Sequence, residues 1–267
     1  MTALREFYGF KTQPFNIAID TNLFYESRSH QEALASLLYG IEERKGMILI
    51  TGEVGTGKTT LCKALLDRLP GTVRTSLILN PYFSEVQLLQ AIVEDFGLEP
   101  EKKNRLDIVK KLDEFLIDLS LHQGNAVLVI DEAQDLKARQ LEQIRLLSNL
   151  ETRHGKLLQI VLVGQPELKA RLRQFDLRQI YQRFAVKYEL QPLGFGDTKA
   201  YVDFRLTRSG AEGVTLLPEA YQVIQDFSKG IPRLINLLCD RALLLGFVRQ
   251  QKVLGQDIFI ASLEEIR

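Results

Sequence analysis

The chain has 267 residues, enough for one large domain or for a large domain with a small one. Apolar residues make up 45% and charged residues 25%, as is usual for a soluble globular protein. Lysine and arginine equal aspartate and glutamate in number, so the zero net charge does not favour an obligate nucleic-acid or membrane binder.

Several features predict a cytoplasmic protein. Cys62 and Cys239 lie far apart and without metal-ligand spacing, which fits a reducing compartment best. The first residues lack the basic start and apolar core of a signal peptide. No run of about 18 apolar residues occurs, because polar side chains interrupt the most apolar late stretch, 234–248. We therefore expect that the chain as given does not cross a membrane.

Residues 1–45 differ in composition from the rest of the chain. Aromatic and turn-forming residues crowd their first half: Phe7, Tyr8, Phe10, Pro14, Phe15, Asp20, Thr21, Asn22, Phe24 and Tyr25. This composition predicts an irregular arm that packs through its aromatics onto the domain that follows. A helix is predicted over 29–44, with Ser29 as its N-cap and Glu32 three residues on. We expect arm and helix to be part of that domain.

The stretch 51–60 carries the motif around which the chain is organised. It follows an apolar, strand-like run, 46–50, and precedes a segment with helical spacing, 61–69. In that context the pattern G-x-x-x-x-G-K-[ST] predicts a phosphate-binding loop. Its residues are Gly52, Glu53, Val54, Gly55, Thr56, Gly57, Lys58, Thr59 and Thr60. The alternative is a chance match in a glycine-rich turn, expected in about one of a hundred chains of this length.

The residue types of this loop suit a nucleoside triphosphate. Gly52, Gly55 and Gly57 let the backbone turn tightly and aim its N–H groups inward. The following helix presents its positive dipole end to the same place. Lys58 adds a full charge for the β- and γ-phosphates, and the Thr59 hydroxyl can ligate Mg²⁺. We expect ATP and Mg²⁺ to bind here.

Strands and helices alternate after the loop and predict the fold class. Strands are predicted at 73–79, 126–130, 157–163 and 184–190, and the second and third of these are apolar runs. Helical spacing indicates helices at 84–96, 104–122, 136–150 and 167–181. This order predicts an α/β P-loop domain over 46–192, with a central parallel sheet flanked by helices. Only helices follow, at 197–208, 218–228, 232–248 and 256–266, which predicts a small all-helical lid domain over 193–267.

Two strand ends carry polar side chains that suit hydrolysis of a phosphoanhydride. Asp131 follows the strand 126–130 and can hold Mg²⁺ through water, while Glu132 can orient and deprotonate the attacking water. Gln165 closes the next strand and could position water or sense the γ-phosphate. The alternatives are an acid at an ordinary strand end and a polar residue that closes a strand before Pro166.

Two arginines are candidates for contact with the transition state. Arg183 directly precedes the last strand and could act as an arginine finger in a neighbouring subunit's site, with Arg178 as the nearby rival. Arg233 lies at the start of a lid helix and could contact the γ-phosphate. For each arginine the alternative is an ordinary surface residue.

Other polar groups have weaker interpretations. Residues 102–105 and 110–111 form a local basic cluster, either a solvated helix face or a contact to a nucleic-acid backbone. The histidines His30, His122 and His154 have no metal-ligand spacing.

Taken together, these stretches resemble the AAA+ ATPases, and more narrowly the ExeA (general secretion pathway protein A) family with its pilus-biogenesis relative MshM. The resemblance spans nearly the whole chain. The stretches that carry it are 7–10, 14–15, 24–27, 30–34, 39–41, 52–59, 131–134, 164–168 and 230–233.

The resemblance implies a cytoplasmic ATPase at the inner face of the bacterial inner membrane, with an inner-membrane partner protein. A role of Arg183 in a neighbouring subunit's site implies a homo-oligomer, ring or open. Fuller members continue into a transmembrane helix and a peptidoglycan-binding domain. This chain ends with the lid, so it is either a short member or a piece of a longer one. The turn 19–21 lacks the expected proline-flanked aspartate. Residues near Phe10, Phe15 and Leu23 are expected to approach the adenine.

The predicted function is a Mg²⁺-dependent ATPase that drives assembly of a type II secretion or type IV pilus apparatus. One alternative is an ATP-dependent DNA-binding regulator of transposition, in which the basic cluster with Arg171 and Arg173 lines the DNA. Another is a nucleotide-gated scaffold without turnover, although Glu132 argues against it.

Overall fold

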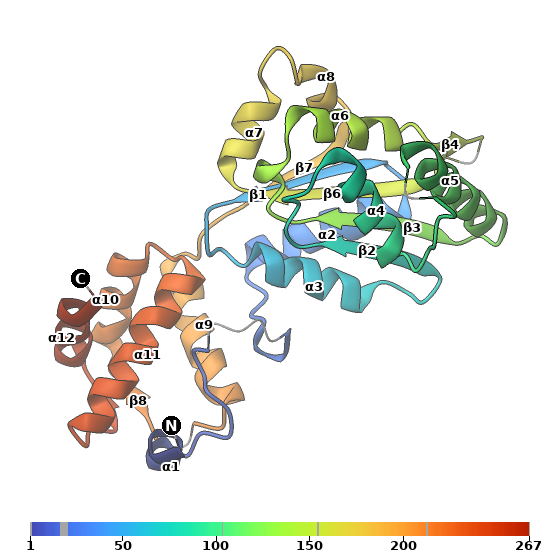
Figure 1. Cartoon of the computed structure of the whole chain (residues 1–267). Helices are drawn as coiled ribbons and strands as arrows, with labels where there is room; N and C mark the ends of the chain where they lie inside the picture. Colours follow the sequence, from blue (N-terminus) through green and yellow to red (C-terminus); the bar gives the residue numbers. More distant parts are fainter. Residues whose placement is uncertain (1, 17–20, 103, 154, 212, 267) are drawn as a thin grey trace. The chain divides into compact units, whose positions relative to one another are not determined.

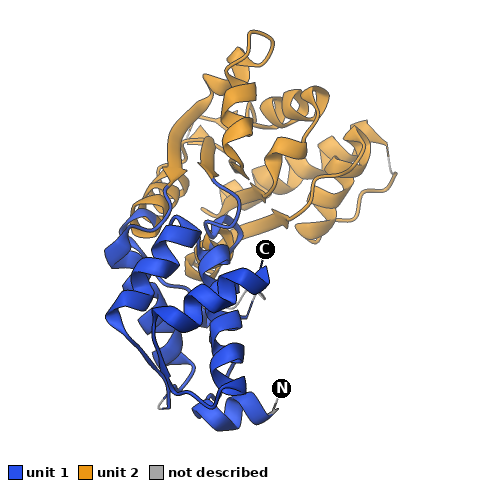
Figure 2. Ribbon diagram, turned by 90° about the vertical axis from the view of Figure 1, so that its left-hand side faces the viewer, with its two compact units in different colours: residues 1–29, 53–60, 191–267 blue, residues 30–52, 61–190 orange. Residues whose placement is uncertain are grey.

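The computed structural model describes residues 2–16, 21–102, 104–153, 155–211 and 213–266. By their contacts these residues form two compact units (Figure 2). Unit 1 comprises residues 1–29, 53–60 and 191–267, and unit 2 comprises 30–52 and 61–190. Only the phosphate loop and the two ends of the chain therefore belong to unit 1.

Unit 2 is built on a parallel five-stranded sheet (Figure 1). The strand order is β2-β3-β6-β1-β7. The strands are β1 (Met47–Gly52), β2 (Val73–Ile78), β3 (Asn125–Ile130), β6 (Leu158–Gly164) and β7 (Phe184–Leu190). The three central strands β3, β6 and β1 are almost wholly buried, which explains why their sequences are mostly apolar. The predicted parallel sheet is confirmed.

Helices flank this sheet (Figure 1). They are α2 (Arg28–Glu42), α3 (Lys58–Arg68), α4 (Glu85–Asp95), α5 (Arg105–Leu121), α6 (Ala138–Leu147), α7 (Pro166–Leu172) and α8 (Arg178–Tyr181). Ser84 caps α4, since its side chain accepts a hydrogen bond from the Gln87 N–H. Ser29 is not the N-cap of α2 as predicted: α2 begins one residue earlier, and the Ser29 hydroxyl instead accepts from the Gln191 N–H at 3.0 Å.

Several short elements were not predicted from the sequence. A hairpin joins β4 (Glu151–Thr152) to β5 (Gly155–Lys156), and a 3₁₀ turn, η2, spans Ala133–Asp135. Elements of two or three residues contain too few side chains to show a period.

Unit 1 is mainly helical. Its helices are α1 (Thr2–Tyr8), α9 (Phe195–Arg208), α10 (Pro218–Ser228), α11 (Pro232–Val248) and α12 (Gln256–Ile266), with a 3₁₀ turn, η1 (Thr21–Leu23). A short parallel pair joins β8 (Thr215–Leu216) to β9 (Val253–Leu254). The predicted helical C-terminal region is therefore present. Among the described residues, no helix is both long enough and apolar enough to span a bilayer.

The aromatic arm differs from expectation in structure and in partner. Its first residues form α1, and its aromatic side chains enter the hydrophobic core of unit 1, whereas we expected an irregular arm on the α/β domain. Tyr8 is fully buried, and its hydroxyl donates to the carbonyls of Leu243 and Gln251, both at 3.1 Å. Phe10 and Phe15 are buried in the same core. The turn 19–21 lies almost wholly outside the described residues.

Candidate functional site

The phosphate loop connects the end of β1 at Gly52 to the start of α3 at Lys58. Gly55 and Gly57 have φ angles of 83° and 97°, a region that side chains other than glycine rarely adopt. Gly52 has no such angle and closes β1 in strand conformation. Two of the three loop glycines therefore provide the special backbone geometry, and the third is the last residue of the strand.

The loop is stabilised by bonds to one of its own carbonyls. The Glu53 carbonyl accepts from the Thr56 hydroxyl at 2.8 Å and from the Lys58 ammonium at 3.0 Å. Both side chains are buried, with 1% of Thr56 and 6% of Lys58 exposed. The Lys58 charge is thus held over the loop backbone at the N-terminus of α3, where both the ammonium and the helix dipole attract a phosphate.

The start of α11 packs directly on this loop within unit 1. The Arg233 N–H donates to the Gly55 carbonyl at 3.2 Å. A Cβ on Gly55 would lie 2.7 Å from the Arg233 Cβ and 3.0 Å from the Ile231 Cγ2, so only glycine fits there. The Arg233 side chain itself is exposed. The backbone contact therefore places Arg233 beside the loop, as its predicted role as a sensor requires.

Gly230 is needed for the approach to α11. It has a φ of 78°, and a Cβ on it would lie 1.9 Å from the Leu193 carbonyl oxygen. The Gly230 carbonyl also accepts from the Leu193 N–H at 2.9 Å. The segment Gly230-Ile231-Pro232-Arg233 is therefore fixed at its first residue by the backbone and at its last by the phosphate loop.

In unit 2, polar residues gather where the central strands end. Ile130 pairs with Leu162 and Thr51 with Gly164, so β3, β6 and β1 end at one edge of the sheet. Asp131 follows β3 and is 1% exposed; its Oδ1 accepts from the Glu132 N–H at 2.9 Å. Gln165 follows β6 as the N-cap of α7. The sheet therefore brings Asp131, Glu132 and Gln165 to the same edge.

Gln134 connects Glu132 to Gln165. Its Nε2 donates to the Glu132 Oε2 at 2.6 Å, and its Oε1 accepts from the Gln165 N–H at 3.1 Å. A Cβ on Gly164 would lie 2.9 Å from the same Oε1, so a side chain at Gly164 would push the amide away. Both polar ends of Gln134 are thus used to link the two residues predicted to act on the γ-phosphate.

Arg171 supports this connection from α7. Its Nη1 donates to the carbonyls of Gln134 at 3.2 Å and Leu136 at 2.6 Å, which fixes the turn η2. The sequence analysis missed Gln134 as a functional candidate and considered Arg171 only for contact with DNA. The guanidinium of Arg171 instead serves an internal structural purpose, which weighs against the alternative that it lines DNA.

Arg183 lies at the other end of the sheet. It is exposed and directly precedes β7, whose first residue Phe184 pairs with Met47 at the start of β1. Because the sheet is parallel, Arg183 and Asp131 belong to opposite edges of unit 2. The rival Arg178 is also exposed, at the first residue of α8. Arg183 is therefore not brought together with the other predicted residues of unit 2.

The basic cluster has only local partners among the residues that the structure describes. The Asn104 side chain caps α5, and Lys110 pairs with Glu114 at 3.7 Å one turn along the same helix. Lys103 and His154 lie outside the described residues. These contacts fit the interpretation of a solvated helix face.

Comparison with known proteins agrees with this geometry. Residues 41–172 match the family described as AAA domain. The chain is 46% identical over 262 residues to General secretion pathway protein A of Aeromonas hydrophila, covering 97% of this chain and 48% of the relative. Over nearly its whole length the chain is therefore similar to the AAA+ ATPases of the general secretion pathway protein A family. It spans about half the length of that relative.

Solved structures of AAA+ proteins share the fold. The ORC2 protein of Aeropyrum pernix superposes with a TM-score of 0.72 at 20% identity, covering 96% of this chain and 72% of that one. Cdc6p of Pyrobaculum aerophilum gives 0.70 at 18% identity, with 95% and 70% covered. A mutant of RuvB from Thermotoga maritima gives 0.58 at 19%, with 88% and 69% covered. At these identities the likeness shows the fold alone, and the P-loop fold implies that the chain binds a nucleotide.

Proposed function

We propose that this chain hydrolyses ATP and that hydrolysis drives assembly of a type II secretion or type IV pilus apparatus. The observation that carries the enzymatic part is the connection from Glu132 through Gln134 to Gln165, since it links a carboxylate base to a polar sensor. The biological part is supported by the 46% identity to General secretion pathway protein A, a relative of about twice the length.

The proposed chemistry assigns one task to each residue. Loop N–H groups over 52–60 and the Lys58 ammonium bind the phosphates and neutralise charge that builds up on them. Glu132 orients a water and takes its proton as that water attacks the γ-phosphorus. The bond from the γ-phosphorus to the β–γ bridging oxygen breaks in the same reaction, and the products are ADP and phosphate. Gln165 and Arg233 contact the γ-phosphate, so that turnover depends on the position of α11.

The donor set fits Mg²⁺. Thr59 offers a hydroxyl and Asp131 a carboxylate, and Mg²⁺ prefers oxygen ligands together with substrate phosphates and water. Thr59 and Asp131 would hold the ion. When bound, it would neutralise charge on the β- and γ-phosphates.

The proposal includes a homo-oligomer, ring or open, in which Arg183 acts on a neighbouring subunit. Its exposed position at the sheet edge opposite Asp131 supports a role in trans. By family, we place the protein in the cytoplasm at the inner face of the inner membrane, with a membrane protein of the same apparatus as its partner.

The enzymatic proposal is tested with Glu132→Gln. The amide keeps the shape of the side chain but cannot accept the proton, so kcat should fall by about 100-fold or more. Binding of a fluorescent ATP analogue should stay near that of the parent, because Glu132 is not assigned to the phosphates. If the variant hydrolysed ATP as fast as the parent, Glu132 would not be the base.

A further inference from the structure

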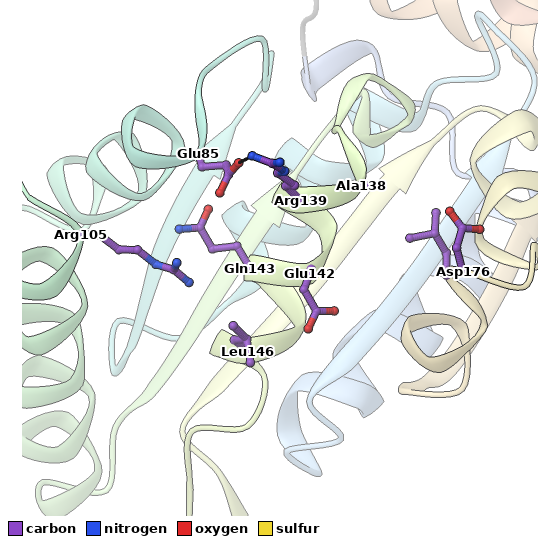
Figure 3. A pocket seen from close by; sticks show the side chains of 9 residues that line it. Glu85, Arg105, Ala138, Arg139, Glu142, Gln143, Leu146 and Asp176 are labelled. Atoms are coloured by element: carbon purple, nitrogen blue, oxygen red, sulfur yellow. Dashed lines mark ion pairs between the residues drawn. The ribbon is translucent and has the colours of Figure 1, made fainter.

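A surface pocket of about 550 Å³ lies in unit 2, and Arg105 of the basic cluster is one of the residues that line it (Figure 3). Its lining comes from the first turns of α4, α5 and α6, from the body of α6, and from the segment between α7 and α8. None of the predicted site residues lines it. The volume is within the range of pockets that bind ligands, roughly 300–1,000 Å³.

The buried side chain of Gln143 indicates that the pocket binds a partner molecule. The residue is 4% exposed, and neither its Nε2 nor its Oε1 has a hydrogen-bond partner among the described residues. Figure 3 shows its side chain projecting from α6 between Arg105 and the Glu85–Arg139 pair. A buried amide without partners destabilises the folded chain, whereas an apolar side chain of the same size would not. Its presence therefore points to a partner that the amide meets in a complex.

Among the described residues, the pocket has an unpaired positive side chain on one side and an unpaired negative side chain on the other. Arg105, at the start of α5, has no ion pair among the described residues, and Asp176 at the other side has none either (Figure 3). Arg139 and Glu85 face each other at 3.9 Å, and Glu142 is held by Arg145 at 2.6 Å. A ligand that neutralises both free charges must therefore carry an anionic group toward Arg105 and a cationic group toward Asp176.

One exposed apolar side chain lines the pocket, and two more directly adjoin lining residues in the sequence. Leu146 lines the pocket and is 43% exposed, while Leu106 and Phe175 are the sequence neighbours of Arg105 and Asp176 and are 77% and 94% exposed. Clustered aromatic, aliphatic and arginine side chains are typical of protein–protein contact surfaces. A small metabolite would leave such a rim in water, whereas a polypeptide would cover it.

We propose that this pocket binds an extended segment of a partner polypeptide that carries an acidic and a basic side chain. The acidic side chain pairs with Arg105 and the basic one with Asp176. Between them a backbone peptide group pairs with Gln143, because it offers both the carbonyl and the N–H that a carboxamide needs. Leu146 covers an apolar side chain of the same segment. This proposal does not depend on ATP hydrolysis.

The experiment is a selection from a displayed library of random octapeptides against the intact chain, followed by fluorescence anisotropy with the enriched peptides. We expect enriched peptides to share an acidic and a basic residue separated by apolar positions. Gln143→Leu should weaken their binding by about tenfold or more, because two hydrogen bonds are lost. The same variant should melt about 2 °C or more above the parent, because an unpaired buried amide is removed. If Gln143→Leu binds the peptides more weakly but is more stable than the parent, Gln143 serves in binding and not in stabilising the fold.

A second variant uses only exposed side chains and should fold normally. Arg105→Gln should weaken binding about three- to tenfold and reduce its salt dependence. Lys110→Gln, on the same helix but outside the pocket, removes the same charge and should leave binding unchanged. ATP turnover by these variants should equal that of the parent, so a failure of the proposed function would be recognised separately.

Three outcomes would overturn the proposal. One is a selection that enriches no peptide, or only peptides without the acidic and basic pair. Another is equal binding by the parent and Gln143→Leu. The last is self-association of the chain that Gln143→Leu abolishes without any peptide binding, which would make a second copy the occupant.

Discussion

Among single residues, Glu132 in the turn after β3 is held by both its backbone and its side chain. Glu132 has a φ of 48°, in the left-handed region that costs a non-glycine residue free energy, and such strain is concentrated at functional sites. Its N–H is bonded to Asp131 and its carboxylate to Gln134. Backbone and side chain are thus both held, so the carboxylate has little freedom to reorient.

Gln134 should therefore affect turnover more than nucleotide binding. Gln134→Leu removes the bond to the Glu132 carboxylate, and we expect kcat to fall by about tenfold, as for a lost positioning interaction, with KM for ATP unchanged. Steady-state ATPase assays measure both constants. Gln174→Leu changes an exposed glutamine of the same unit and should have no effect. A variant with an unchanged kcat would show that Gln134 does not position Glu132.

Among the structural elements, the phosphate loop packs against the first residues of α11. The Arg233 N–H, the Gly55 carbonyl and the missing Cβ of Gly55 together bring the helix start to the loop. Sequence spacing identified each of these segments, but it could not show that they touch, because about 180 residues separate Gly55 from Arg233.

Gly55→Ala tests this contact. The added methyl would meet the Arg233 Cβ at 2.7 Å, and φ = 83° is strained for alanine, so loop and helix must move apart. We expect ATP affinity to fall at least about tenfold, with a loss of thermal stability of about 1–2 kcal/mol. The measurements are calorimetric titration and thermal melting. Gly71→Ala is the matched control, because it has no positive φ and no atom within 4 Å of an added Cβ. Equal behaviour of the two variants would contradict the contact.

The arm provides a second test at this scale. Tyr8→Phe removes the donor to the Leu243 and Gln251 carbonyls, so we expect the free energy of unfolding to fall by about 1–2 kcal/mol. Urea unfolding measures it, with Tyr82→Phe as control, since Tyr82 is 83% exposed. Burial raises the pKa of Tyr8 to about 12 from its ordinary 10. The unfolded chain therefore ionises first, and the parent, unlike Tyr8→Phe, should lose this part of its stability as pH rises from 10 to 12.

The strands and the residues at their ends could be predicted from the sequence. The apolar runs of β1, β3 and β6 predicted a parallel sheet because both faces of those strands are buried. The acids after β3 and the glutamine after β6 were found for the same reason, since parallel strands end at one edge. Gln134 was missed because its role depends on two side-chain hydrogen bonds in a short 3₁₀ turn, where no periodicity exists. The packing partner of the aromatic arm was not predicted, because an aromatic composition indicates that a segment is buried but does not indicate which domain it packs against.

Across the whole chain, the proposed site residues of unit 2 lie at one edge of its sheet, and Arg183 lies at the other edge. Arg183 is exposed and lies near Glu151, whose pKa is lowered mainly by its hydrogen bond from Lys156, with a minor contribution from Arg183. In the mechanism that we propose, an arginine in that place acts in a neighbouring subunit, and this role requires the proposed oligomer.

Mixing two inactive variants tests the trans role. Lys58→Ala should bind ATP poorly, and Arg183→Ala should hydrolyse it about 10³-fold or more slowly, as for a lost arginine finger. Co-assembled in equal amounts, they should regain part of the parent activity, because some interfaces combine an intact loop with an intact arginine. Arg178→Ala in place of Arg183→Ala is the control for the rival residue. No recovery in samples whose co-assembly is confirmed by sedimentation would exclude Arg183 as the finger.

The division of unit 1 into three stretches of sequence also has a consequence for biosynthesis. Tyr8 leaves the ribosome early, but its acceptor Leu243 is 235 residues further along. Residues 30–190, which supply nearly all of unit 2, are complete before the last stretch of unit 1 begins. The aromatic arm must therefore wait, with its rings unburied, until α11 has been translated, and during that time these rings are exposed to chaperones and to aggregation.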